Sequence, residues 1–199
     1  LSTATLVSFP TAVFHGEDSL LVTLRAVGAG YPLRGALRIA AEPYGPARTV
    51  RALPRPGEAW VESRVLARFG LRPGEVLEVG AQRFVIGAVL DYRPDQGAAF
   101  ADLAPTVLFN LADLPSTRLL QNGSRASQVQ LYAGEPAAID GFRRWLKPRQ
   151  GEAVRVVALG ESSEQLQGSL DRAQRFLSLS ALATVLLCAI AVAMAARRY

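Results

Sequence analysis

The sequence predicts an α+β fold of short strands and short helices, followed by one long helix at the C-terminal end. Short runs rich in Val, Leu, Ile and Thr recur along residues 1–160, separated by turns rich in Gly and Pro. Helical patterns in this part are short and do not alternate regularly with the strands, which argues against a βαβ series. The stretch 176–196 carries no charged residue and no Pro or Gly, which is typical of a continuous apolar helix.

Two strands are predicted at the start of the chain. Thr3–Phe9 carries Thr and Val in an apolar setting, and Leu20–Val27 (LLVTLRAV) is the stronger strand pattern. Between them, the Gly-Glu-Asp that follows His15 is typical of a hairpin turn. The glycines of residues 28–30 end the second strand. Residues 42–58 are rich in Pro and Gly, so we expect a loop there.

One short helix and one β-hairpin are predicted in the middle of the chain. Trp60–Phe69 has apolar residues at helical spacing, and Gly70 follows where a helix C-cap favours a left-handed residue. Val76–Val79 and Phe84–Leu90 are β-rich runs across a short Gly-containing turn, which indicates a hairpin. Residues 91–97 (DYRPDQG) end the hairpin with turn residues.

Five more elements are predicted before the long helix. Thr106–Phe109 is a candidate for a short buried strand, and Ala112–Pro115 begins a helical turn. Gln128–Tyr132 alternates polar and apolar residues, as a half-buried strand does. Pro136–Leu146 has a helix start at its Pro and apolar residues along one side, and Val154–Leu159 is predicted as the last strand.

The C-terminal region is predicted to form a single long helix from about Ser163 to Arg198. Ser162 and Gln165 make a capping-box signature for its start. Apolar residues then recur every three or four positions, which places them along one face of the helix. The first half of this helix is therefore amphipathic. The residues that define this predicted stalk are Ser162, Leu166, Leu170 and Ala173.

The second half of this helix has the length and composition of a membrane span. At a rise of about 1.5 Å per residue it covers about 30 Å, the thickness of a bilayer's hydrocarbon core. Hydroxyl groups such as that of Ser178 are tolerable in lipid because they can bond back to carbonyls of their own helix. The alternative, a buried helix of a soluble protein, is usually shorter and keeps a polar edge. The predicted span includes Phe176, Leu177, Leu182, Leu186 and Ala196.

Composition limits the partners and the compartment. The formal net charge is +5, but we see no basic run with interleaved aromatics, so no nucleic-acid partner is expected. The single cysteine, Cys188, lies inside the apolar run, so an intrachain disulfide is impossible. Arginines at 172 and 175 precede the span and those at 197 and 198 follow it. Counting positive charges therefore leaves the orientation open.

No constellation of residues points to catalysis, a metal or a cofactor. His15 is the only histidine, so a zinc site and a His-based triad lack their ligands and base. Asp91, Asp95, Asp102 and Asp113 do not have the spacing of a calcium loop, and Asp beside Pro and Gly is normal in turns. The glycine pairs lack the Lys-Ser/Thr of a phosphate loop. We therefore expect a protein that is not an enzyme and binds no cofactor.

Four aromatic residues are candidates for contacts with a partner or ligand: Phe14, Tyr44, Trp60 and Phe100. Membership of a small hydrophobic core is the interpretation favoured for most of them, and the sequence does not separate the two.

Several motifs carry a resemblance to a known family. Residues 31–35 (YPLRG) and 61–74 (VESRVLARFGLRPG) look like the extracytoplasmic domain of the FtsX-like/MacB-like ABC transporter permeases. Residues 91–97, 104–114 (APTVLFNLADL) and 123–125 (GSR) narrow the resemblance to the YbbP branch. It continues through LDRAQRFL and the final ARRY, so it covers almost the whole chain, and residues 91–114 are its most specific part. Glu75 departs from the Asp that related chains tend to have, which affects only local turn chemistry.

The resemblance implies a subunit of the bacterial inner membrane, with residues 1–175 in the periplasm. Residues 1–160 would form a two-lobed MacB-like domain, with a membrane-proximal lobe built from both ends and a distal lobe at about 45–125. Residues 161–175 would be the stalk, 176–196 the second transmembrane helix and 197–199 the start of a cytoplasmic segment. The first and later membrane helices would lie outside this sequence.

The resemblance also implies partners and a mechanism. These partners are a cytoplasmic ABC ATPase subunit, a second permease copy in a homodimer, the lipid bilayer and a periplasmic esterase. ATP-driven movement of the helices would pass through the stalk to the periplasmic domain and export or extract a hydrophobic substrate. No catalytic residue is carried over. A membrane-anchored binding module or sensor that acts alone stays open as the alternative, and an anchored enzyme is the weakest hypothesis.

Overall fold

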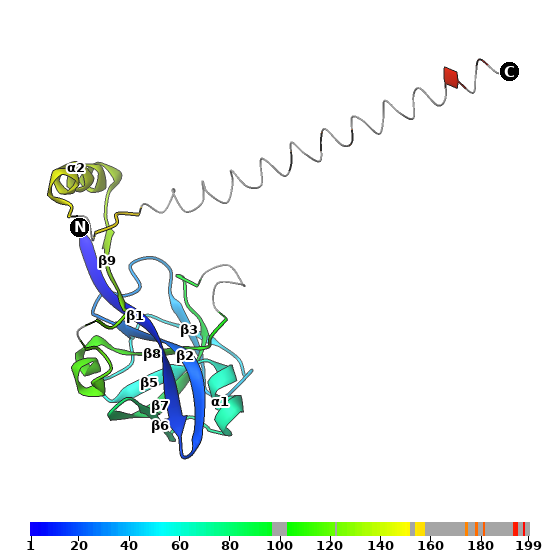
Figure 1. Cartoon of the computed structure of the whole chain (residues 1–199), viewed down its shortest axis with the longest axis vertical. Coiled ribbons are helices and arrows are strands. Elements are labelled where there is room, and N and C mark those ends of the chain that lie inside the picture. Colours follow the sequence, from blue (N-terminus) through cyan, green and yellow to red (C-terminus); the bar gives the residue numbers. More distant parts are fainter. Residues whose placement is uncertain are drawn as a thin grey trace. The chain divides into compact units, whose positions relative to one another are not determined.

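The computed structural model describes residues 1–96, 103–121, 123–151 and 154–157, and single residues at 174, 178, 181, 193, 194 and 197. The chain divides into two compact units, Leu1–Arg144 and Trp145–Tyr199. Within the described residues, the first unit contains nine strands in one mixed sheet together with short helices, so the predicted α+β class is confirmed (Figure 1).

The elements have the following bounds. The strands are β1 (Ser2–His15), β2 (Asp18–Val27), β3 (Leu37–Ala40), β4 (Arg48–Val50), β5 (Glu58–Val61), β6 (Val76–Val79), β7 (Gln82–Tyr92), β8 (Thr106–Asn110) and β9 (Ser127–Ala133). The helices are α1 (Ser63–Phe69) and α2 (Pro136–Leu146), with 3-10 turns η1 (Leu111–Asp113), η2 (Pro115–Thr117) and η3 (Lys147–Arg149).

Six of the strands close into a small barrel. Neighbouring strands follow the order β7-β5-β8-β2-β1-β6, and β6 also pairs with β7, which completes the ring. The contact between β1 and β6 is a single residue pair, Phe14 opposite Glu78. Strands β5 and β7 are parallel, as are β2 and β8, and the other neighbours are antiparallel. Closure satisfies the hydrogen-bonding edges that an open sheet would leave exposed.

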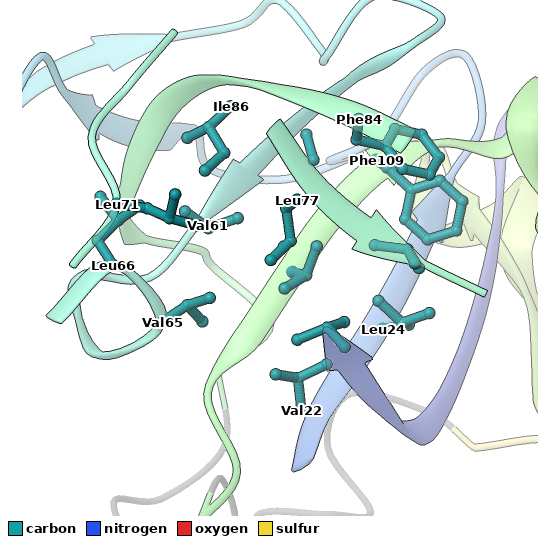
Figure 2. Packing of buried hydrophobic residues seen from close by; sticks show 14 of the residues in the cluster. Val22, Leu24, Val61, Val65, Leu66, Leu71, Leu77, Phe84, Ile86 and Phe109 are labelled. Atoms are coloured by element: carbon teal, nitrogen blue, oxygen red, sulfur yellow. The ribbon is translucent and has the colours of Figure 1, made fainter. Parts of the chain in front are cut away.

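The interior of the barrel is filled by apolar side chains from every strand of the ring. Phe84 and Phe109 lie edge to face, with ring centroids 5.2 Å apart, and both are fully buried (Figure 2). Val65 and Leu66 of α1 join this inner core. Figure 2 shows the other labelled members pointing toward one another: Val22, Leu24, Val61, Leu71, Leu77 and Ile86.

A second core covers part of the outer surface of the barrel. Successive residues of a strand point to opposite faces, so Ala59 and Val61 of β5 face the inner core while Trp60 between them faces the outer one. Tyr31 and strand β3 contribute to the outer core. The barrel wall is therefore buried on both sides in this region.

The long strand β1 joins the barrel to the other end of the first unit. Its first half pairs with β9, from Ser2 opposite Ala133 to Ser8 opposite Ser127, and its second half pairs with β2 (Figure 1). Helix α2 follows β9 directly and contains no buried residue. The rings of Tyr132 and Phe142 lie 4.5 Å apart, which packs the helix against the strand.

Most predicted elements are confirmed. The first two strands, the hairpin Val76–Leu90, the strand at Thr106 and the strand at Gln128 all lie within observed strands, and Pro136–Leu146 is a helix with those bounds. The two-residue turn after His15 is confirmed by the pairing of His15 with Asp18. Gly70 caps α1 in the left-handed conformation, with φ 68°, and its N–H donates to the Leu66 carbonyl.

Two predicted boundaries are wrong. The helix expected from Trp60 begins at Ser63, because Trp60 and Val61 pair as part of β5 with strands on both sides. The first strand does not end before Pro10 but continues to His15. Residue 10 lies between the segments of β1 that pair with β9 and with β6, so its missing N–H costs no bond to a strand on that side.

Three further corrections concern irregular segments. The loop predicted for residues 42–58 contains the short strand β4, which pairs with β3. The helical turn predicted at Ala112 is a pair of 3-10 turns, η1 and η2. The strand predicted at Val154–Leu159 is not present at residues 154–157, which belong to no strand, and residues 158–159 lie outside the described residues.

The second unit contains the end of α2, η3 and a few described residues beyond. Gln174 and Ser178 are helical, and the Ser178 hydroxyl donates to the Gln174 carbonyl at 2.8 Å, the back-bonding expected for a serine in this segment. No helix within the described part of the chain is both long enough and apolar enough to span a membrane.

Candidate functional site

The largest polar cluster among the described residues gathers three side chains around one carboxylate. Arg25 of β2 forms an ion pair with Asp95. The Tyr31 hydroxyl donates to Asp95 Oδ1 at 2.7 Å. Arg93 Nη1 donates to the Asp95 backbone carbonyl at 3.1 Å and reaches Asp95 Oδ1 at 3.3 Å. We call these four residues the Asp95 cluster.

Burial makes the Asp95 cluster energetically important. Arg93 is 1% exposed and Tyr31 is 3% exposed, whereas the Asp95 side chain keeps 31% of its surface in water. Burial raises the pKa of Tyr31 well above its ordinary value, and the negative charge of Asp95 and the hydrogen bond to it raise this pKa further. The Tyr31 hydroxyl is therefore a proton donor to Asp95 throughout the physiological pH range.

The Asp95 cluster joins two of the recognised motifs. Tyr31 begins YPLRG, and Arg93 and Asp95 belong to DYRPDQG. The backbone at Gly35 also lies close to the ring of Pro94, since a Cβ added at Gly35 would lie 2.8 Å from Pro94 Cβ, and Gly35 has φ 75°. Only glycine combines this close approach with a positive φ at low cost. These motif residues therefore fix two turns to each other on the outside of the barrel.

The motif APTVLFNLADL fixes a different loop. Asn110 Nδ2 donates to the Pro54 carbonyl at 3.0 Å, and its Oδ1 accepts from the Ala112 N–H at 3.0 Å. Asp113 Oδ2 accepts from the Gly57 N–H at 2.9 Å. The segment that leads into β5 is thus held against the end of β8 by side chains of this motif.

The geometry of these motif residues supports structural roles. Asp91 pairs with Arg38 at 3.0 Å, Asp95 pairs with Arg25, and Asp113 accepts from a backbone N–H. The described aspartates of the predicted series therefore have separate partners, and Asp102 lies outside the described residues. Within the described ranges, no group of three or more His, Cys, Asp or Glu residues could hold a metal ion.

The residues predicted for the stalk and the membrane span lie outside the described residues. These are Ser162, Leu166, Leu170 and Ala173 of the stalk, and Phe176, Leu177, Leu182, Leu186 and Ala196 of the span. Of the four surface candidates, Phe14 and Tyr44 are exposed, at 44% and 85%, Trp60 is buried, and Phe100 lies outside the described residues.

Two clusters were missed by sequence reasoning. The sequence did contain one indication of the Asp95 cluster: Arg25 is a charged residue inside a largely apolar strand. The second is the run RRWLKPR at residues 143–149, which places four cations around Trp145.

The comparisons with known proteins agree with the recognised motifs. No protein-family model matches the chain. An uncharacterised ABC transporter permease of Escherichia coli K12, YbbP, is 32% identical over 193 residues, which cover 97% of this chain and 23% of the relative. The chain therefore spans about a quarter of that relative's length.

A solved structure shares the fold. The extracellular domain of the noncanonic ABC-type transporter YknZ from Gram-positive bacteria superposes with a TM-score of 0.54, at 13% sequence identity. The match covers 78% of this chain and 80% of that chain. At this low identity the likeness establishes the fold alone.

Proposed function

From the homology of the chain to an ABC transporter permease of the YbbP branch, we propose that it forms the periplasmic domain and second transmembrane helix of such a permease. Residues 1–160 form the MacB-like domain, 161–175 the stalk, 176–196 the membrane span and 197–199 the start of a cytoplasmic segment. The chain hydrolyses no ATP itself, and an ATPase subunit on the cytoplasmic side supplies the energy. The homology over 97% of the chain is the observation that carries this proposal.

The pairing of β1 with β9 supports a two-lobed arrangement. It brings residues 2–8 beside residues 127–133, so both ends of the domain meet in one strand pair. The distal lobe, proposed at about 45–125, supplies strands β5 to β8, which close the barrel together with β1 and β2. Movement of either flanking membrane helix then enters the domain through β1 or β9.

The closed barrel supports a mechanical role. Its interior is filled by buried apolar side chains, and its ring of paired strands leaves few ways to bend without breaking hydrogen bonds. Such a body moves as a unit when its attachment strands are displaced. We therefore propose mechanotransmission: ATP-driven helix motion passes through the stalk and displaces the domain, which exports or extracts a hydrophobic substrate in a permease homodimer.

The test is the coupling of the stalk to ATP hydrolysis. The full-length permease and its ATPase are reconstituted together, and transport-linked ATPase activity is compared with that of the ATPase alone. Insertion of Gly-Gly after Leu170 introduces a flexible break in the stalk and is expected to abolish the stimulation. A matched control inserts Gly-Gly after Gly16, in an exposed turn where no atom lies within 4 Å of an added Cβ.

The control insertion is expected to retain the stimulation. Full stimulation by the Leu170 insertion would contradict the coupling role of the stalk. A permease that forms no complex with any ATPase would favour the alternative, an anchored binding module.

A further inference from the structure

The edge strand β4 and the loop before it form an exposed surface of the first unit. Among the described strands, β4 pairs with β3 alone, so its other edge faces no described strand. An open edge is a template on which an extended chain can add as a further strand. The strand begins at Arg48 and is followed by Arg51. These arginines disfavour the pairing of β4 with a second copy of itself, because like charges would meet.

The charge of this surface is positive. Residues 43–57 contain Arg48, Arg51 and Arg55 and no acidic residue, and all three arginine side chains are exposed. Among the described residues, these three arginines form no hydrogen bond or ion pair through their side chains. The three cations are therefore available to a partner.

The acidic residues of the neighbouring segments do not cancel this charge. Asp91 of β7 pairs with Arg38 of β3 at 3.0 Å, and Glu58 accepts from Trp60 Nε1 at 2.6 Å. Glu42 is exposed and precedes the segment, so residues 42–57 carry three arginines against one carboxylate, a net charge of 3 − 1 = +2. A partner with acidic side chains fits this balance.

Tyr44 is a second observation, independent of the charge. Its side chain is 85% exposed and its φ is 61°, in the left-handed region. This region is costly for a bulky side chain, and residues held there cluster at functional sites. The Gly45 N–H donates to the Glu42 carbonyl at 3.1 Å, and Pro43 and Pro46 restrict the backbone of the same turn. Protection of an edge by charge does not require an exposed tyrosine, whereas binding hot spots are enriched in tyrosine and arginine.

We propose that β4 and Tyr44 bind an extended, acidic segment of a partner protein, which adds as a strand to the open edge of β4. Backbone hydrogen bonds to β4 hold the segment, and Arg48 and Arg51 pair with its carboxylates. The Tyr44 ring packs against an apolar side chain of the same segment. Charge complementarity selects this occupant, since a second copy of the chain brings arginines against arginines. The inference goes beyond the proposed function and does not depend on the stalk.

The dimensions permit one strand to reach both features. Tyr44 precedes Arg48 by four residues, so their Cα atoms lie at most about 14 Å apart. The three residues of β4 extend over about 10 Å. An extended segment of eight residues spans about 27 Å, which is enough to pair with β4 and contact the Tyr44 ring.

The test measures binding of a fluorescein-labelled peptide to the full-length permease in phosphatidylcholine nanodiscs, by fluorescence anisotropy. The peptide has eight residues that alternate Glu and Val, and a second peptide alternates Lys and Val. Saturable binding is expected for the acidic peptide alone, and high salt should weaken it because salt screens exposed charges. An acidic peptide with N-methyl groups on its four central residues keeps its charge but cannot donate backbone hydrogen bonds there. It should bind at least about tenfold more weakly.

The decisive charge variant is R48Q/R51Q. Removal of two exposed cations should weaken binding of the acidic peptide by about fivefold in total, the usual contribution of two exposed ion pairs. The matched control R72Q/R125Q removes two exposed arginines outside residues 42–57 and should bind like the wild type.

The Y44G variant separates the contact from a folding defect. Glycine adopts a positive φ without strain, so the midpoint of urea unfolding should stay close to that of the wild type. Loss of the ring should nevertheless weaken binding of the acidic peptide at least about tenfold, as for an interface hot spot.

Three results would overturn the proposal. These are the absence of saturable binding by the wild type up to millimolar peptide, equal binding of the N-methylated peptide, and equal losses in R48Q/R51Q and R72Q/R125Q. The last result would mean that net charge alone accounts for the binding. A Y44G variant that binds like the wild type would overturn the role of Tyr44.

Discussion

The barrel and the segment formed by β9 and α2 use aromatic pairs in opposite ways. In the barrel, Phe84 and Phe109 meet inside a closed wall and are fully buried. In the β9–α2 segment, Tyr132 and Phe142 meet at a shorter centroid distance, 4.5 Å, but Tyr132 is 42% exposed and the helix buries no residue. Ring distance alone therefore does not determine stabilisation, because the area removed from water differs.

The barrel and the β9–α2 segment also differ in how many strands pair with each strand. Each strand of the barrel ring has a partner on both sides, whereas β9 pairs with β1 alone among the described strands. An edge strand and a helix without buried residues open more easily than a closed barrel. We infer that the barrel is the rigid part of the first unit and that the β9–α2 segment depends on contacts made outside it.

The largest expected effect comes from truncating matched phenylalanines in the two regions. Phe109→Ala should lower the free energy of unfolding by about 3–5 kcal/mol, because it leaves a cavity in the inner core. Phe142→Ala should cost about 1 kcal/mol, since its ring is only partly buried. Urea unfolding followed by Trp60 fluorescence in a W145F background measures both. Equal losses would contradict the distinction between the regions.

The second-largest expected difference in stability is between variants of two ion pairs on the outside of the barrel. Asp95→Ala should destabilise the protein by about 3 kcal/mol, because it leaves the buried Arg93 without its carboxylate. Asp91→Ala should cost less than about 1 kcal/mol, since the pair of Asp91 with Arg38 is exposed at both ends. Urea unfolding at neutral pH measures the change in the free energy of unfolding for both variants. A larger loss of stability for Asp91→Ala would contradict the importance of the Asp95 cluster for the stability of the barrel.

The smallest effect is a pH dependence that arises from Tyr31. Its pKa is raised in the folded protein, so the folded state retains the proton while the unfolded chain releases it above its usual pKa of about 10. The contribution of Tyr31 is therefore fully present below pH 10 and is lost as the pH rises further. The Tyr31→Phe variant should be less stable than the wild type by about 1 kcal/mol at pH 8.

This difference should shrink above pH 10, because phenylalanine has no proton to release. Unfolding curves of the two proteins at stepped pH measure it. A constant difference across this range would mean that the Tyr31 hydroxyl titrates normally in the folded protein.

Local pattern predicted most of the secondary structure and failed at particular places. The helix Pro136–Leu146 was predictable because its start signal and its apolar spacing are both local. The β5 strand at Trp60 was not, since the same residues fit a helical spacing and only pairing with β7 and β8 selects the strand. The Asp95 cluster was also unpredictable, because Tyr31 and Asp95 lie 64 residues apart.

The sequence by itself determined the alternation of short strands with turns, the glycine that caps α1, and the motifs that relate the chain to ABC transporter permeases. These features are encoded by neighbouring residues or by similarity along the chain. Only the tertiary structure decided that the sheet closes into a barrel through the pairing of β6 with both β1 and β7. It also decided which charges are buried together. Closure and burial depend on contacts between distant segments, whose free energy no local pattern contains.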